Sequence, residues 1–171
     1  MEEVTRLLAY EEIRQLASRY ALAIDSRDLD ALVALFVDDV RVGRERQGRE
    51  ALKEDFDRQL REIGTSILFV GNHVIDIEDD ETAKGAVYCK GEIQVEDRWV
   101  EQAILYKDRY ARRDGHWYFV RRVHLLWYGT DFGQNPIGLP PANWPENHSG
   151  KGTLPESWES WKRFWEGGAS D

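Results

Sequence analysis

The sequence predicts a single α+β domain, in which three N-terminal helices pack in a cone against a curved, mostly antiparallel sheet. Apolar residues recur at helical spacing up to residue 63 and alternate with polar residues after residue 64, which predicts helices first and strands second. The chain has 171 residues, of which 42% are hydrophobic and 32% charged, and this composition suits one packed domain. A C-terminal extension follows the sheet.

Three helices account for the first part of the chain. The spacing of Leu7, Leu8, Ile13 and Tyr20 predicts a helix over residues 4–24. Asp28 is a plausible N-cap for a short second helix. A short strand is expected around residues 40–42. A third helix is expected over 49–63, and Gly64 stands where a helix commonly stops.

Four extended runs follow, over residues 67–77, 82–95, 99–111 and 117–128. The sequence Arg113-Asp114-Gly115 is a strong hairpin signal between the last two runs. Because strand side chains alternate between faces, residues 118, 120, 122, 124, 126 and 128 are expected to share one face.

The tail differs from the rest of the chain. We expect residues 1–128 to form the cone and residues 129–171 to add a surface loop and a Trp-rich helix to the same domain. Thr153 to Glu156 resembles a capping box at the start of that helix. Trp158, Trp161 and Trp165 would share one of its faces, which would close the open end of the sheet or pack on another subunit.

Charge and composition narrow the function classes. A net charge of −9 argues against a general nucleic-acid binder. No apolar run approaches the ~18 residues that span a membrane, and no signal peptide is visible. The single cysteine, Cys89, reads as a packed thiol in a reducing compartment, so we expect a cytoplasmic protein. No residue cluster has metal-ligand spacing, and no glycine-rich phosphate loop occurs.

Several short motifs occur in a specific order. They are Tyr20-Ala-Leu-Ala-Ile-Asp25, Gly71-Asn72-His73-Val74-Ile75, and Tyr106-Lys-Asp108-Arg-Tyr110 running into Arg113-Asp-Gly115-His-Trp117. Together they resemble the SnoaL-like family, over roughly residues 5–128. The resemblance implies the nuclear transport factor two-like fold, a homodimer, and dehydration, dehydrohalogenation, isomerisation or cyclisation of small hydrophobic cyclic molecules without a cofactor.

Asp25 is the first catalytic candidate. At the end of an apolar helix stripe its carboxylate should have a raised pKa and could act as a base near neutral pH. The alternative is that Asp25 only ends the helix through local hydrogen bonds to the turn at residues 26–28. Tyr20 could donate a hydrogen bond to a substrate oxygen, or could be a core aromatic residue.

The histidines are the second group of candidates. By the resemblance, the family's catalytic histidine position falls on Leu68, and strand alternation places His73 on the opposite face unless a bulge intervenes. The resemblance also matches Leu126 to a pocket-facing residue, which would turn His124, with Arg122, toward the cavity. His124 could pair with Asp25, act alone, or pack among aromatic residues. His116 and His148 carry little weight.

The sequence therefore predicts a cofactor-independent proton-transfer enzyme (a lyase, isomerase or cyclase) with catalytic Asp25, Tyr20 and His124. One alternative is a non-catalytic binding or assembly protein, which Leu68 favours. Another is an epoxide hydrolase-like enzyme, which needs Arg122 and a second carboxylate close to Asp25. Polar Gln102 could also orient a ligand. The expected substrate-binding residues are Leu68, Asn72, Tyr88, Tyr106, Arg122 and Leu126.

Overall fold

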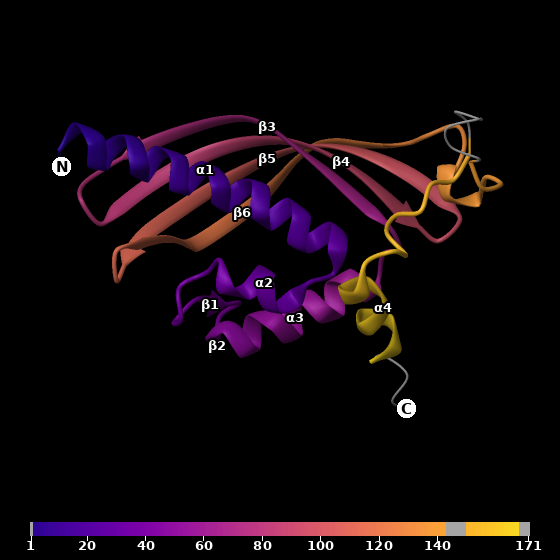
Figure 1. Cartoon of the computed structure of the whole chain (residues 1–171), viewed down its shortest axis with the longest axis horizontal. Helices are drawn as coiled ribbons and strands as arrows, with labels where there is room; N and C mark the ends of the chain where they lie inside the picture. Colours follow the sequence, from indigo (N-terminus) through magenta and orange to yellow (C-terminus); the bar gives the residue numbers. More distant parts are fainter. Residues whose placement is uncertain (1, 143–149, 168–171) are drawn as a thin grey trace.

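The computed structural model describes residues 2–142 and 150–167 and confirms the α+β architecture. Three helices lie on one side of a four-stranded antiparallel sheet (Figure 1). They are α1 (Glu3–Ser26), α2 (Leu29–Ala34) and α3 (Arg49–Arg61). The side of the sheet that these helices cover is called the inner face below, and the opposite side the outer face.

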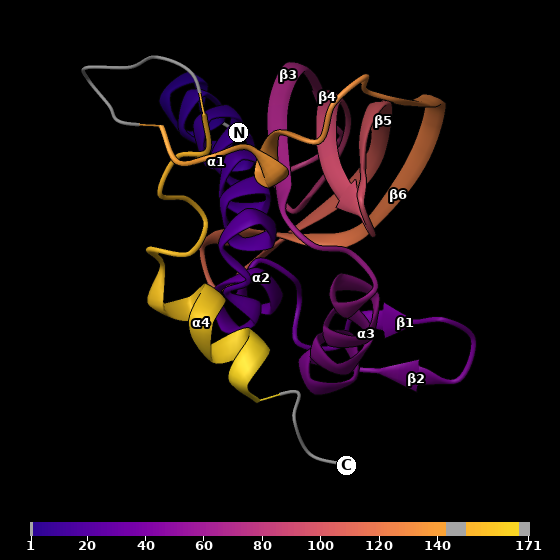
Figure 2. The same cartoon turned by 90° about the vertical axis from the view of Figure 1, so that its right-hand side faces the viewer.

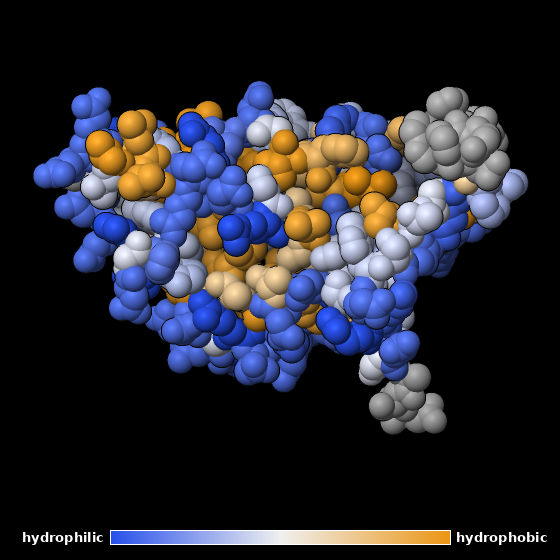
Figure 3. Space-filling view, viewed as in Figure 1, coloured by the Kyte–Doolittle hydropathy of each residue, from blue (hydrophilic) through white to orange (hydrophobic). Residues whose placement is uncertain are grey.

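The helix boundaries follow from local signals. Arg27, with φ at 58°, ends α1 in the left-handed conformation typical of helix C-termini. Asp28 then caps α2, as predicted, because its carboxylate accepts a 3.0 Å hydrogen bond from the Ala31 N–H. The buried stripe of α1 begins only at Ala9. Leu7 and Leu8 are exposed, and Figure 3 shows apolar surface at this end of the helix.

A small hairpin joins α2 to α3. Its strands are β1 (Arg41–Val42) and β2 (Arg46–Gln47), whereas the sequence predicted one strand around Val40 and Val42. The second strand is exposed and has no apolar alternation, so its sequence carries no strand signal.

The main sheet has the order β3-β4-β5-β6, with each strand antiparallel to the next. Figure 2 shows the sheet curving around the helices. Asp114 and Gly115 both have positive φ, which gives the β5–β6 hairpin the twist that the sequence predicted. The strands are β3 (Ser66–Ile77), β4 (Thr82–Val95), β5 (Arg98–Arg113) and β6 (His116–Asp131).

Two bulges in β6 change which residues face the helices. Val120 and Trp127 have no partner on β5, so each inserts an extra residue into the strand. The prediction that the even-numbered residues from 118 to 128 share one face is therefore wrong. Phe119 lies on the inner face, and so do Arg122, His124 and Leu126, whereas Tyr128 lies on the outer face.

The C-terminal helix α4 (Glu159–Glu166) packs on the end of α1. Trp161 and Phe164 are buried there, and the Ser160 hydroxyl donates a 2.8 Å hydrogen bond to the Ser26 carbonyl. The predicted capping box is wrong, because residues 153–157 form a separate turn and Trp158 is extended before the helix begins. The apolar face of this helix is thus covered within the chain.

Candidate active site

A cavity of about 860 Å³ lies between the inner face and the helices α2 and α3. Tyr20 enters it from α1, Tyr106 from β5, and Arg122 and His124 from β6. Phe36 and Phe56 supply apolar walls. Charged side chains, among them Asp39, Asp55 and Arg121, also line the cavity. The cavity thus combines aromatic surface with polar and charged groups that could orient a small molecule.

The Arg122 guanidinium is a nearly fully buried charged group of a cavity-lining residue. It donates two hydrogen bonds to the Asp108 carboxylate, of 2.9 Å from Nε and 2.7 Å from Nη2. The third nitrogen, Nη1, is buried and has no partner among the described residues. The guanidinium carbon lies 4.4 Å from the Tyr20 ring centroid and 4.2 Å from that of Tyr106. One strong donor is therefore left without an acceptor.

The two phenols beside Arg122 are hydrogen-bond donors. Burial raises the pKa of Tyr20 and that of Tyr106 above the ordinary value of a phenol. Within the described part of the chain neither hydroxyl makes a hydrogen bond. Both hydroxyls therefore remain protonated at neutral pH and can donate to a ligand oxygen.

His124 lines the same cavity, and its ring centroid lies 5.5 Å from that of Tyr106. Partial burial lowers its pKa, so the imidazole is neutral at pH 7 and can accept a proton. It makes no hydrogen bond to any residue that the structure describes. His124 is thus a free base at the exposed side of the cavity.

Asp25 lies in a different cluster, between α1 and β3. Its carboxylate accepts hydrogen bonds of 3.1 Å from the Ser66 hydroxyl and 2.9 Å from the Leu68 N–H. The local-turn alternative is therefore wrong. Burial raises the pKa of Asp25 to about 6, although these two hydrogen bonds and Arg27 lower it in part. The predicted rise in pKa is confirmed.

Arg27 completes this cluster and was missed by the sequence analysis. Its guanidinium donates to the Ser66 hydroxyl at 2.9 Å and to the carbonyls of Ile24 and Gly64. The Trp161 ring of α4 covers it, with the guanidinium carbon 4.9 Å from the ring centroid. Burial lowers the pKa of Arg27 to about 10. No sequence signal marked it, because a charged residue after a helix usually lies in solvent.

The structure does not bring Asp25 and His124 together. They belong to opposite edges of the sheet, since Asp25 contacts β3 and His124 lies on β6. Among the described residues no imidazole hydrogen-bonds to Asp25, and His148 lies outside them. The arrangement for epoxide hydrolysis is not found there either, because Arg122 pairs with Asp108 and not with a carboxylate beside Asp25.

His73 does face inward. Gly71 and Asn72 form a bulge opposite Tyr88, because Val70 pairs with Cys89 while His73 pairs with Val87. Its Nε2 lies 3.1 Å from the Tyr110 hydroxyl, which in turn donates a 2.8 Å hydrogen bond to Asp108. Sequence reasoning missed Asp108 and Tyr110, although a carboxylate at an inward position of an apolar strand is itself a signal.

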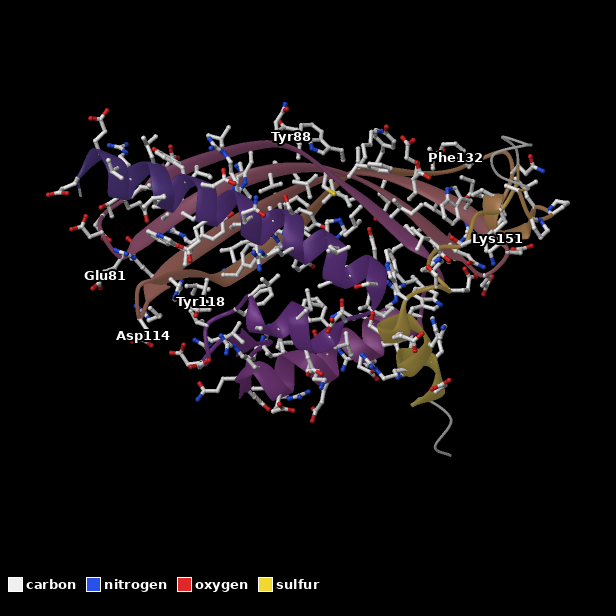
Figure 4. The ribbon with its side chains drawn as sticks, viewed as in Figure 1. Glu81, Tyr88, Asp114, Tyr118, Phe132 and Lys151 are labelled. Atoms are coloured by element: carbon white, nitrogen blue, oxygen red, sulfur yellow. The ribbon has the colours of Figure 1, made fainter. Side chains whose placement is uncertain are left out.

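The other predicted binding residues divide between the two faces. Asn72 and Tyr88 line a separate groove of about 710 Å³ on the outer face, where Tyr88 stacks on Trp127 at 6.3 Å. Figure 4 shows Tyr88 pointing away from the helices. Gln102 pairs with Gly91 and Gly129, beyond the cavity. Leu126 lies on the inner face but is 54% exposed. Leu68 contacts Asp25 through its backbone N–H, and its side chain packs against the same core cluster as Tyr20.

Two further findings concern metal binding and membrane spanning. Within residues 2–142 and 150–167, no three metal-binding side chains lie close enough to hold an ion. In the same residues no helix is long and apolar enough to cross a membrane.

The SnoaL-like domain is the family whose pattern this chain matches, over residues 5–123. A search of curated protein sequences finds no match. Solved structures also match the fold, and the three described next are 20–25% identical to this chain.

The structure of a type 2 hexachlorocyclohexane dehydrochlorinase (LinA) has a TM-score of 0.72 at 20% identity, and the match covers 81% of this chain and 100% of that one. A scytalone dehydratase candidate from Novosphingobium aromaticivorans has a TM-score of 0.67 at 22% identity, covering 81% and 99%. A protein of the same organism with an NTF2-like, cystatin-like fold has a TM-score of 0.61 at 25% identity, covering 72% and 85%. These likenesses show the fold.

Proposed function

The chain belongs to the SnoaL-like domain family, and we propose that it is a cofactor-independent lyase-type enzyme acting on a small hydrophobic cyclic molecule. The observation that carries the proposal is the buried Arg122 Nη1, which has no partner among the described residues and belongs to a residue that lines the cavity together with two free phenols and a neutral imidazole. Two structural neighbours, a dehydrochlorinase and a dehydratase candidate, are named for eliminations, which is consistent with this reaction class.

The polar groups favour an uncharged substrate with an oxygen acceptor. Asp108 neutralises Arg122, both tyrosines are protonated, and His124 is neutral. At these four groups a charged ligand would lose its hydration without gaining an opposite net charge, whereas a carbonyl oxygen could accept from Arg122 Nη1 and a phenol. These donors would stabilise the negative charge that develops on the oxygen when a neighbouring carbon loses a proton.

The base in this proposal is His124, acting alone from the exposed side of the cavity. Asp25 is the alternative base, because a carboxylate with a pKa of about 6 is also suited to proton transfer near neutral pH. The two hydrogen bonds of Asp25, and its absence from the residues that line the cavity, favour His124. An isomerase or a cyclase would use the same groups as a lyase.

Hydrogen–deuterium exchange at the α-carbons of 2-tetralone, a neutral bicyclic ketone, tests this function. The protein should accelerate the exchange, which is followed by proton NMR in D2O. His124→Gln should slow it by roughly 10²-fold or more, the usual contribution of a general base. Asp25→Asn should retain it, and so should His116→Gln, which changes an exposed histidine elsewhere on β6.

A non-catalytic binding protein is the second candidate. The observation that favours it is Leu68, which places a backbone N–H, and no imidazole, against Asp25. In that case 2-tetralone would bind to the wild-type protein without any acceleration of its exchange. That result would contradict the enzymatic proposal.

We also propose a homodimer that pairs through the outer face. The exposed apolar side chains Phe69, Val74, Leu125 and Trp127 support this, since exposed apolar side chains that gather on one face often mark an interface. Sedimentation velocity should show a dimer that Trp127→Glu converts to a monomer. Leu22→Glu, on the exposed side of α1, should leave the dimer intact, and a monomeric wild type would refute the pairing.

A further inference from the structure

We propose that His73 is a positioning residue, which holds Arg122 through Tyr110 and Asp108 so that Nη1 alone is presented to the ligand. The inference rests on the proposed function only in taking Arg122 as a ligand-binding group. The chain of contacts runs from His73 Nε2 to the Tyr110 hydroxyl at 3.1 Å and on to Asp108 Oδ2 at 2.8 Å. Asp108 then holds Arg122 through two hydrogen bonds.

The backbone of β3 is shaped to bring His73 into this chain. Without the bulge at Gly71 and Asn72, alternation from Val70 would place His73 on the outer face. The bulge inserts one extra residue and turns the imidazole inward. An exposed histidine would need no such irregularity, so the bulge is an independent indication that the contact is built into the fold.

A glycine on β4 leaves room for the contact. Gly85 lies between the strand that carries His73 and the strand that carries Tyr110. It pairs with Ile75 on β3 and with Asp108 on β5. A Cβ atom at this position would lie 3.0 Å from the Tyr110 hydroxyl and 3.1 Å from His73 Nε2. Such distances are too short for a comfortable fit, so the His73–Tyr110 contact passes over a position where only glycine fits without displacement.

The direction of the hydrogen bonds fixes the state of the imidazole. The Asp108 carboxylate accepts from Arg122 and from Tyr110, so the Tyr110 proton is already used. The oxygen of Tyr110 can therefore only accept from His73, which must carry its proton on Nε2. Burial lowers the pKa of His73 to about 4, so the ring is neutral and exists as one tautomer at pH 7.

In this network of four side chains, each hydrogen-bond acceptor has a defined donor. Asp108 Oδ1 receives Arg122 Nε, and Oδ2 receives Arg122 Nη2 together with Tyr110. Tyr110 cannot rotate its hydroxyl away from Asp108 without meeting the N–H of His73. The carboxylate, and with it the guanidinium plane, is thereby fixed in orientation across β5 and β6.

Nitrogen-15 NMR of the full chain tests the inference without any substrate. In the wild-type protein, long-range proton–nitrogen spectra should assign His73 to the Nε2–H tautomer between pH 6 and 8. The Arg122 Nε–H signal should exchange slowly with solvent. His73→Leu should speed this exchange roughly tenfold, the factor expected for one lost hydrogen bond, whereas His73→Gln, which restores a donor, should return it to the wild-type rate.

Gly85→Ala gives a second test that leaves every side chain of the network in place. It should speed the exchange of Arg122 Nε–H as His73→Leu does, because the added methyl group separates His73 from Tyr110. Gly91→Ala is the matched control, on the same strand but between Ile104 and Leu68, and should have no effect on Arg122.

An Nδ1–H tautomer for His73, or the same exchange rate in His73→Leu as in the wild type, would overturn the inference. The outcome is independent of the proposed function. If 2-tetralone fails to exchange or to bind, the enzymatic proposal fails while the NMR result on His73 still stands. Conversely, an active enzyme in which His73→Leu leaves the exchange rate of Arg122 Nε–H unchanged would refute only the positioning role.

Discussion

The Arg122 guanidinium and the Asp108 carboxylate form an ion pair that is held by two hydrogen bonds. The two side chains are 4% and 0% exposed. Arg122 lines the cavity, and one of its guanidinium nitrogens has no partner among the described residues. A buried pair of this kind costs desolvation energy, which is offset only by good geometry and further hydrogen bonds. Its retention at the cavity is the main physical reason to regard this cavity as the functional site.

Asp108→Asn should strongly destabilise the protein. The substitution leaves the Arg122 charge buried without a counter-charge, a change that typically costs about 3–5 kcal/mol. Urea unfolding gives the difference in free energy. The matched control is Asp131→Asn, which breaks the exposed pair with Arg98 and should cost about 1 kcal/mol or less. Equal costs for the two variants would contradict the account of the buried pair.

The neutral ion pair also predicts ligand selectivity. Calorimetry should show tighter binding of 2-tetralone than of 2-naphthoate, which has the same ring system but carries a charge. In Asp108→Asn, if it is folded at low temperature, the excess positive charge of Arg122 should shift the preference toward 2-naphthoate. A wild-type preference for the anion would show that the cavity is not electrically neutral.

Asp25 should make stability fall as pH rises. Burial raises its pKa to about 6 in the folded protein from an ordinary value of 3.8, so the folded state holds the proton more tightly between these values. Stability contributed by this group is therefore full near pH 4 and is lost by pH 7, a change of about 2–3 kcal/mol.

Asp25→Asn removes this titration. The difference in unfolding free energy between Asp25→Asn and the wild type should grow in favour of the variant from pH 4 to pH 7. Taking the difference cancels the opposite effect of His73, whose pKa is lowered to about 4 and which stabilises the fold as pH rises. A difference that is constant with pH would mean that Asp25 is not buried as described.

Trp161→Ala tests the packing of α4 on α1. Trp161 is 8% exposed and its ring covers the Arg27 guanidinium, so removal of the ring should cost about 3 kcal/mol or more in unfolding free energy. Trp165 is 37% exposed on the same helix, and Trp165→Ala should cost clearly less. If both variants unfold like the wild type, α4 does not dock on α1 in solution.

Much of the fold follows from local sequence signals. The strand over residues 82–95, the Asp28 cap and the turn at Asp114 and Gly115 were all predictable, because each depends on a few neighbouring residues. The raised pKa of Asp25 was predictable as well, since it depends mainly on burial at the end of an apolar helix stripe.

The arrangement of the site could not be predicted in the same way. The bulges at Val120, Trp127 and Gly71 each shift the alternation of the strand by one residue. No residue pattern marks the two bulges of β6, and a glycine within a strand, such as Gly71, is compatible with a bulge without requiring one. The alternation of side chains along the strand predicted the inward positions of Arg122 and His124 correctly only because both residues lie between the two bulges of β6. The pairing of Asp108 with Arg122 depends on the register of β5 against β6, which is a property of two strands together.

A crystal structure of the protein with bound 2-tetralone would test the central proposal most directly. The measured quantity is the distance from the ketone oxygen to Arg122 Nη1. We predict a hydrogen bond of about 2.9 Å, with an α-carbon of the ketone facing the His124 imidazole. A ketone bound only in the outer groove beside Tyr88 and Trp127, with the inner cavity free of ligand, would contradict the proposal.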